Sequence, residues 1–154
     1  SELLPPRTYD RTDLEGKPEL AKAYEDLMSF TNSAILCRFP TFNRADRYNY
    51  PTIRKALSAA TGYSIDAQEM QQIGERNLVL LKHLASKRGF DRQDDDLTSR
   101  FQEPLPSGAT EGESLPREQF SQTIDEYYRL RGYGQNGPTE EKMRELGLDD
   151  ILGK

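Results

Sequence analysis

The sequence predicts an all-α fold, an irregular domain of four to six helices with a long loop at about residues 90–115. Several segments carry apolar residues three and four positions apart, which is the spacing of one helix face. Prolines, capping residues and terminal glycines bound these segments. No stretch alternates apolar and polar residues with the period of two that is typical of a half-buried strand. Together these observations favour helices throughout.

The composition limits the size of the hydrophobic core and the kinds of partner that the chain can bind. Of 154 residues, 34% are hydrophobic and 31% charged, so either the fold is open or apolar surface packs on a body outside this chain. The net charge of −5 and the lack of a dominant basic stripe argue against nucleic-acid binding. No apolar run approaches the ~18 residues of a membrane span, and the first residues lack signal-peptide features. We therefore expect a cytoplasmic protein, and the missing initiator Met predicts a processed chain or a piece of a longer one.

Residues 1–17 are predicted to form an extended arm, which leaves residues 18–154 as a single helical domain. Pro5 and Pro6 forbid a helix in the arm because proline fixes the backbone and lacks an amide donor. Gly16 then breaks the chain a second time, immediately before the first helical pattern.

The first helix is expected to run from Pro18 to about Leu36. Proline suits the first helical turn, and Phe39-Pro40 ends the helix because the residue before a proline is pushed into extended geometry. The apolar face comprises Leu20, Ala23, Tyr24, Leu27 and Met28. The polar face comprises Lys22, Glu25 and Asp26.

Two more helices are predicted in the middle of the chain. A short one spans Pro51–Ala60, with Gly62 as its C-cap. The longest helix begins at Ser64 or Asp66, which are good N-capping residues, and extends to Lys87. Its apolar stripe comprises Ile73, Asn77, Leu80, Leu81 and Leu84.

The loop at 90–115 has little predicted structure apart from a turn of helix at Asp96–Phe101. A structureless loop of this length is unusual in a compact domain. We expect it either to wrap a larger body or to be mobile.

The C-terminal part is again helical. Pro116 opens a helix that ends at Gly132. Thr139 caps a short helix at Glu140–Leu146, and Asp149–Leu152 adds one turn. The apolar residues of the longer helix are Phe120, Ile124, Tyr127, Tyr128 and Leu130.

Three features admit both a functional and a simpler interpretation. A metal or general-base role for His83, the only histidine, competes with a partly buried structural role, which its place beside the leucines favours. Asp94-Asp95-Asp96 lacks the alternating spacing and closing Glu of a calcium loop, which favours a solvated run that caps the following turn. The Tyr127-Tyr128 pair is most simply core.

Four arginines also have two interpretations. They are Arg76, Arg88, Arg92 and Arg100. A phosphate-binding cluster is the functional interpretation. Salt bridges to Glu75 or to the aspartate run are the simpler one, and we favour them.

The single cysteine, Cys37, lies at the predicted end of the first helix. One cysteine cannot form an internal disulfide. From the residue type alone, a lone cysteine in a reducing compartment is a small buried apolar residue more often than a reactive one.

Blocks of residues follow one another in a fixed order through most of the chain. They are Gly16-Lys17, Ile73-Gly74-Glu75-Arg76, Arg88-Gly89-Phe90, Arg92, Asp94-Asp95, Leu97, Arg100-Phe101, Pro104-Leu105-Pro106-Ser107-Gly108, Asp125-Glu126-Tyr127-Tyr128-Arg129-Leu130-Arg131-Gly132-Tyr133, Gly137-Pro138-Thr139, Glu141-Lys142 and Glu145-Leu146-Gly147-Leu148. This order resembles the C-terminal region of the tungsten-containing aldehyde:ferredoxin oxidoreductases, which usually have Trp where this chain has Tyr133. The resemblance implies that the chain is the last helical domain of a considerably longer enzyme subunit.

The resemblance also implies an activity. Members of this family oxidise aldehydes to carboxylic acids with a tungsten or molybdenum ion held by two pterins, and a [4Fe–4S] cluster passes the electrons to ferredoxin. The expected partners are the N-terminal and middle domains of the same enzyme and ferredoxin, and exposed apolar surface favours self-association into a homo-oligomer. The isolated chain is expected to be inactive.

The resemblance assigns three residues to the cofactors. The family has Asp, then four residues ending in Leu, then Cys, which makes Cys37 the fourth cluster ligand and Leu36 a pterin contact. Asn32 stands where the family has Asp, and an amide offers one acceptor oxygen and two donors in place of a carboxylate. The resemblance assigns no catalytic residue to this chain. The replacement of Asp by Asn32 keeps an alternative open, namely a structural or interaction domain of a paralogue that lost the cofactor.

Overall fold

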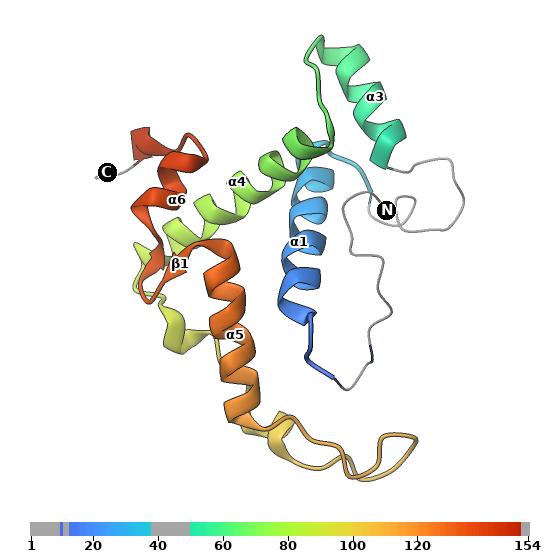
Figure 1. The fold of residues 1–154 in the computed structure, drawn as a ribbon, viewed down its shortest axis with the longest axis vertical. Coiled ribbons are helices and arrows are strands. Elements are labelled where there is room, and N and C mark those ends of the chain that lie inside the picture. Colours follow the sequence, from blue (N-terminus) through green and yellow to red (C-terminus); the bar gives the residue numbers. More distant parts are fainter. Residues whose placement is uncertain (1–9, 11–12, 38–49, 152–154) are drawn as a thin grey trace.

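The computed structural model describes residues 10, 13–37 and 50–151, and this part of the chain is mainly helical, as predicted (Figure 1). Most of the predicted arm lies outside the described residues, as does Phe39-Pro40. The α-helices of the described part are α1 (Lys17–Ser33), α3 (Tyr50–Thr61), α4 (Ala67–Ser86), α5 (Arg117–Arg131) and α6 (Glu140–Glu145).

Helix α1 packs against both α4 and α5 and forms the centre of the fold (Figure 1). Gly74 of α4 sets the approach to α1: a Cβ atom there would overlap the main-chain carbonyl oxygen of Asp26 and lie 3.0 Å from the Asp26 Cα. The two backbones therefore touch at this crossing. Only glycine permits this contact, since every other residue carries a Cβ.

The helix ends follow the capping signals closely, with one exception. Asp66 caps α4 by accepting a hydrogen bond from the Glu69 amide at 2.8 Å, as its residue type predicts. Helix α1 was expected to reach Leu36, and this is wrong because it stops at Ser33. Ile35 has a φ of 56°, in the left-handed region, so the helix cannot continue through it.

The buried apolar residues form two clusters along α4. The first joins α1, α3 and α4 through Leu27, Phe30, Ile53 and Met70. The second joins α4 to the C-terminal segment through Val79, Met143, Leu146 and Leu148. The expectation that the apolar stripe of α4 faces the core is wrong in part, because Leu81 is 61% exposed and Leu84 is also exposed.

The segment at 90–115 contains two short 3₁₀ turns, Arg92–Asp94 and Ser99–Gln102, the second close to the predicted turn. Its remaining backbone bonds to itself: the Leu105 amide donates to the Glu113 carbonyl, and the Leu115 amide donates to the Phe101 carbonyl, both at 2.9 Å. Figure 1 shows this segment projecting beyond the N-terminal end of α5.

A small hairpin follows α5 and corrects the expectation that no strand exists. Strand β1 (Tyr133–Gly134) pairs antiparallel with β2 (Gly137–Pro138). Two residues per strand are too few to leave an alternating pattern in the sequence. Thr139 then caps α6 through the Lys142 amide, and a 3₁₀ turn at Asp149–Ile151 follows, as predicted. Among the described helices, none combines the length and the apolar character that crossing a bilayer requires.

Candidate functional site

The three residues that the resemblance assigns to cofactors lie within residues 32–37, which comprise the last two residues of α1 and the exposed turn that follows them. The Ile35 amide donates to the Asn32 carbonyl at 3.0 Å, and the Leu36 amide donates to the Thr31 carbonyl at 3.2 Å. Asn32 and Cys37 are exposed, and so is Leu36. The interpretation of Cys37 as a buried core residue is therefore wrong.

Side chains hold this turn to the rest of the fold. Asn77 of α4 donates a hydrogen bond to the Ser33 hydroxyl at 2.6 Å, and Ser33 donates to the Ser29 carbonyl at 2.9 Å. The buried Thr31 hydroxyl bonds the Leu27 carbonyl at 2.8 Å. The turn is thus fixed at its helical end and presents its last residues outward.

The number of thiols decides how this chain could contribute to an iron–sulfur cluster, and Cys37 is the single cysteine of the sequence. Among the described residues, no group of three or more His, Cys, Asp or Glu side chains lies close enough to hold a metal ion. A [4Fe–4S] cluster normally takes four thiolates. This chain could therefore donate one thiolate to such a cluster, and three further thiolates would have to come from outside it.

The left-handed residue in this turn is Ile35, whose side chain is 93% exposed. A β-branched residue in this conformation costs about 1–2 kcal/mol because its Cβ crowds the following carbonyl. Ile35→Gly should relieve this strain while removing almost no packing. We expect the free energy of unfolding to rise by about 1 kcal/mol and the Tm by about 2–4 °C, measured by circular dichroism.

Ile35→Ala is the matched control because alanine loses the exposed chain but keeps the Cβ. Its stability should stay below that of the glycine variant. Equal stabilisation by both substitutions would show that the exposed side chain, and not the backbone conformation, is the source of the strain.

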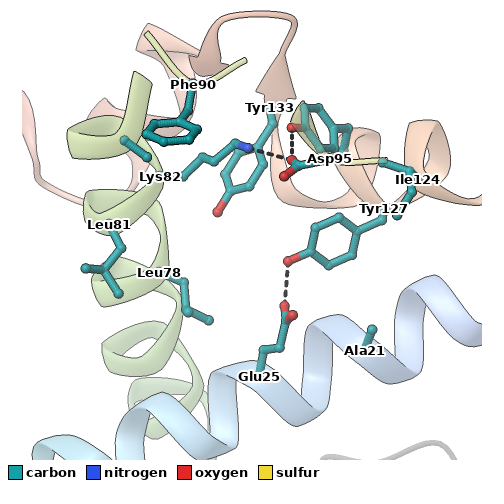
Figure 2. A pocket seen from close by; sticks show the side chains of 12 residues that line it. Ala21, Glu25, Leu78, Leu81, Lys82, Phe90, Asp95, Ile124, Tyr127 and Tyr133 are labelled. Carbon is teal, nitrogen blue, oxygen red and sulfur yellow. Dashed lines mark hydrogen bonds and ion pairs between the residues drawn. The ribbon is translucent and has the colours of Figure 1, made fainter. Parts of the chain in front are cut away.

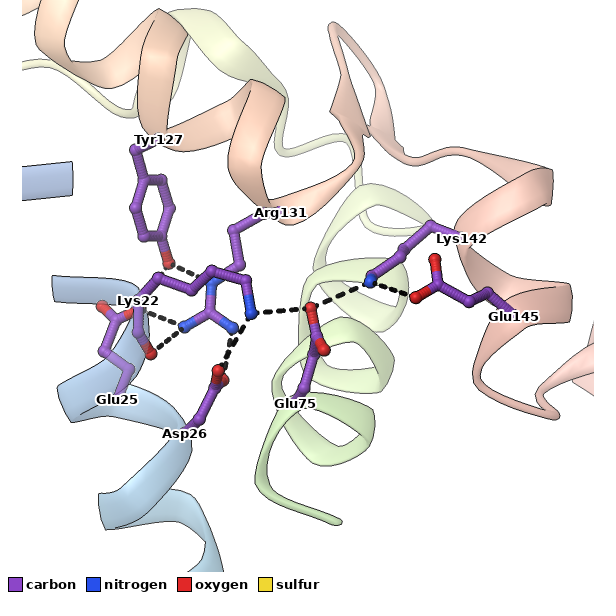
Figure 3. A network of polar contacts seen from close by, with 8 residues as sticks. All are labelled: Lys22, Glu25, Asp26, Glu75, Tyr127, Arg131, Lys142 and Glu145. Atoms are coloured by element: carbon purple, nitrogen blue, oxygen red, sulfur yellow. Dashed lines mark hydrogen bonds and ion pairs between the residues drawn. The ribbon is translucent and has the colours of Figure 1, made fainter. Parts of the chain in front are cut away.

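A buried network of charges joins α1 to α5 at the centre of the fold (Figure 3). Arg131 and Asp26 form an ion pair in which both side chains are 0% exposed. Arg131 also bonds the Glu25 carboxylate at 2.7 Å and the Tyr127 hydroxyl at 3.1 Å. Asp26 was expected on the polar face of the first helix, and this is wrong. Burial raises its pKa above the ordinary value, although Arg131 and Lys22 oppose the shift.

Glu75 extends the network to α4 and α6 (Figure 3). Its carboxylate forms ion pairs with Lys22, at 2.9 Å, and with Lys142, at 3.0 Å. Burial alone would raise the pKa of Glu75, but the two ammonium groups outweigh it and hold that pKa below its usual value. The network therefore ties the four helices together.

The aspartate run is exposed at Asp94 and Asp96, as expected, and each of its members also has a specific partner. Asp95 accepts hydrogen bonds from Lys82, at 2.6 Å, and from the Tyr128 hydroxyl. Asp94 accepts the Asp91 amide in a capping box, and Asp96 pairs with Arg117. His83 is half-buried, as expected of a structural residue.

Three of the four arginines bond to protein groups, but not through the expected salt bridges to Glu75 or to the aspartate run. Arg92 bonds Asp125 at 2.9 Å and Arg100 pairs with Glu103. Arg76 donates to the Leu146 carbonyl at 2.9 Å. Arg100 and Glu103 are a local pair three positions apart. The other contacts, and that of Arg131 with Asp26, left no local signal because their partners are distant along the chain.

Comparison with known proteins decides the family. The family described as aldehyde ferredoxin oxidoreductase, domains 2 & 3, matches residues 2–148. The chain belongs to this family. The resemblance found in the sequence is thereby confirmed, and so is the expected helical fold of an aldehyde ferredoxin oxidoreductase C-terminal domain.

A curated relative of this aldehyde ferredoxin oxidoreductase domain comes from Pyrococcus furiosus. It is named "Aliphatic sulfonate oxidoreductase, WOR-like subunit" and is 32% identical over 148 residues. The alignment covers 92% of this chain and 23% of the relative. The chain therefore spans less than a quarter of the length of that protein.

Proposed function

We propose that this chain is the C-terminal domain of a larger oxidoreductase subunit that oxidises aldehydes to carboxylic acids and delivers electrons to ferredoxin. The family match and the length of the relative support this role. The observation that carries it is the exposed thiol of Cys37, at the end of a turn anchored to α1. A cytoplasmic location and self-association stay predictions.

Three residues of this segment have a defined role in the proposal. Cys37 supplies one thiolate to a [4Fe–4S] cluster, and Leu36 lies against a pterin. Asn32 offers its amide to the pterin edge as one acceptor and two donors. A tungsten or molybdenum bis-pterin would supply the two-electron chemistry when bound. The isolated chain stays inactive because the other cluster ligands lie outside it.

The test is the substitution Cys37→Ala in the longer polypeptide that contains this chain. Loss of one of four thiolate ligands should lower the iron content per subunit and the thiolate-to-iron charge-transfer absorbance after anaerobic purification. Asn32→Asp is the control in the same turn, since it alters the pterin contact and leaves the thiol intact. Unchanged iron in the alanine variant would refute the ligand assignment.

A second candidate substrate comes from the name of the relative, an aliphatic sulfonate oxidoreductase. Anaerobic assays with ferredoxin as acceptor should compare a short aldehyde with a short alkanesulfonate. Turnover of the aldehyde alone supports the first proposal, and turnover of the sulfonate alone supports the second. A longer polypeptide purified anaerobically without tungsten, molybdenum or iron would instead indicate the paralogue that lost its cofactor.

A further inference from the structure

An open groove of about 550 Å³ lies between α1, α4 and α5 (Figure 2). None of the residues of the turn at 32–37 lines it. Leu78, Leu81 and Ala85 line it from α4, three and four positions apart, and Ile124 lines it from α5. The groove is thus a feature separate from the cofactor turn.

The rim of this groove exposes large apolar side chains. Leu81 is 61% exposed and Phe90 is 55% exposed. Figure 2 shows both beside the space between the helices, with Leu78 and Tyr127 further in. A group of large exposed apolar side chains around a groove is typical of an interaction site.

The charged groups of the groove bind one another and leave none for a charged ligand. Lys82 donates to Asp95 at 2.6 Å, and Tyr128 also donates to Asp95. Glu25 accepts hydrogen bonds from Tyr127 and Arg131. Small-molecule sites need a few polar groups that orient the ligand. Here the charged groups and the hydroxyls of Tyr127 and Tyr128 are engaged already, which leaves the Tyr133 hydroxyl among the polar side chains of the lining. The chemistry fits an apolar, uncharged stretch of polypeptide.

We propose that this groove is a docking site for an apolar segment of the same polypeptide, from the part of the subunit outside residues 1–154. The proposal rests on the proposed function in one respect, namely that this chain is one domain of a longer subunit. The relative is covered to only 23% of its length, so such a subunit has ample chain to supply the segment.

Tethering favours this occupant over a second copy or a foreign protein. A segment joined to the same chain is present at an effective concentration of about millimolar, so a shallow apolar contact suffices to hold it. A second copy lacks such a tether, so the apolar contact alone would have to hold it. The groove is therefore better matched to an internal contact between domains.

The test places a photo-reactive group in the groove of the longer polypeptide. Phe90, and in a second variant Leu81, is replaced by p-benzoyl-phenylalanine, and cross-linked peptides are identified by mass spectrometry after irradiation. Tyr63 is the matched control because it is a 75% exposed aromatic residue that does not line the groove. Circular dichroism verifies that each variant folds.

The expected result is a cross-link within one molecule, from position 90 or 81 to an apolar segment outside residues 1–154, with no cross-link from position 63 to that segment. A cross-link between two copies, a cross-link only to residues 1–154, or none at all would overturn the proposal. Iron analysis of the same preparations separates failure of the docking site from failure of the cluster assignment. Iron without the cross-link contradicts the docking site alone, and the cross-link without iron contradicts the cluster assignment alone.

Discussion

Replacing Gly74 by alanine is expected to disrupt the packing of α1 on α4 and to destabilise the fold strongly. The new Cβ would overlap the Asp26 carbonyl oxygen. Main chain cannot yield as a flexible side chain can, so the helices must separate and lose the contacts of the buried Leu27 and Met70. We expect a loss of at least about 4 kcal/mol, measured by urea unfolding.

Gly134→Ala is the matched control for this prediction. The same methyl group there would lie 3.8 Å from the Gly137 carbonyl oxygen, an ordinary contact distance. Gly134 also does not require a left-handed backbone. The control should therefore retain nearly native stability, and similar losses in both variants would contradict the crossing as the cause.

Replacing Arg131 by methionine should cost about 3–5 kcal/mol, because it leaves the buried Asp26 carboxylate without its main counter-ion. Glu25 and Tyr127 lose a partner in the same step. Arg129→Met is the control, since Arg129 is exposed and its pair with Glu126 spans 3.6 Å. That substitution should change stability by less than about 0.5 kcal/mol.

The deficit of the Arg131 variant should depend on pH. Burial already raises the pKa of Asp26 in the native chain, and removal of Arg131 removes the strongest opposing influence. A folded pKa above the unfolded value of about 3.9 gives stability that is present below about pH 4 and is lost as the pH rises through the folded pKa. The deficit measured by urea unfolding should therefore grow from acidic to neutral pH.

The double substitution Asp26→Leu with Arg131→Met separates charge burial from lost packing. Removing both partners eliminates the uncompensated charge of Asp26, so the double variant should regain part of the stability that the single variant loses. A double variant less stable than Arg131→Met would show that the ion pair itself is not the source of the loss.

The helix ends were predictable because their signals are local. Asp66 and Thr139 cap helices through amides three positions away, and Gly132 ends α5 in the left-handed conformation that suits glycine. The end of α1 was missed because Ile35 adopts a backbone conformation that its residue type disfavours. The candidate site was found only through family resemblance, since a lone cysteine carries no local signal for its role.

Periodicity, caps and ordered blocks of residues were enough to predict the helical class, most helix boundaries and the family. The packing of the helices was needed to reveal that Asp26 is buried against Arg131, that Leu81 faces outward and that Cys37 is exposed. Burial depends on which helix packs against which face. Residues 105 positions apart along the chain meet only after α1, α4 and α5 have docked.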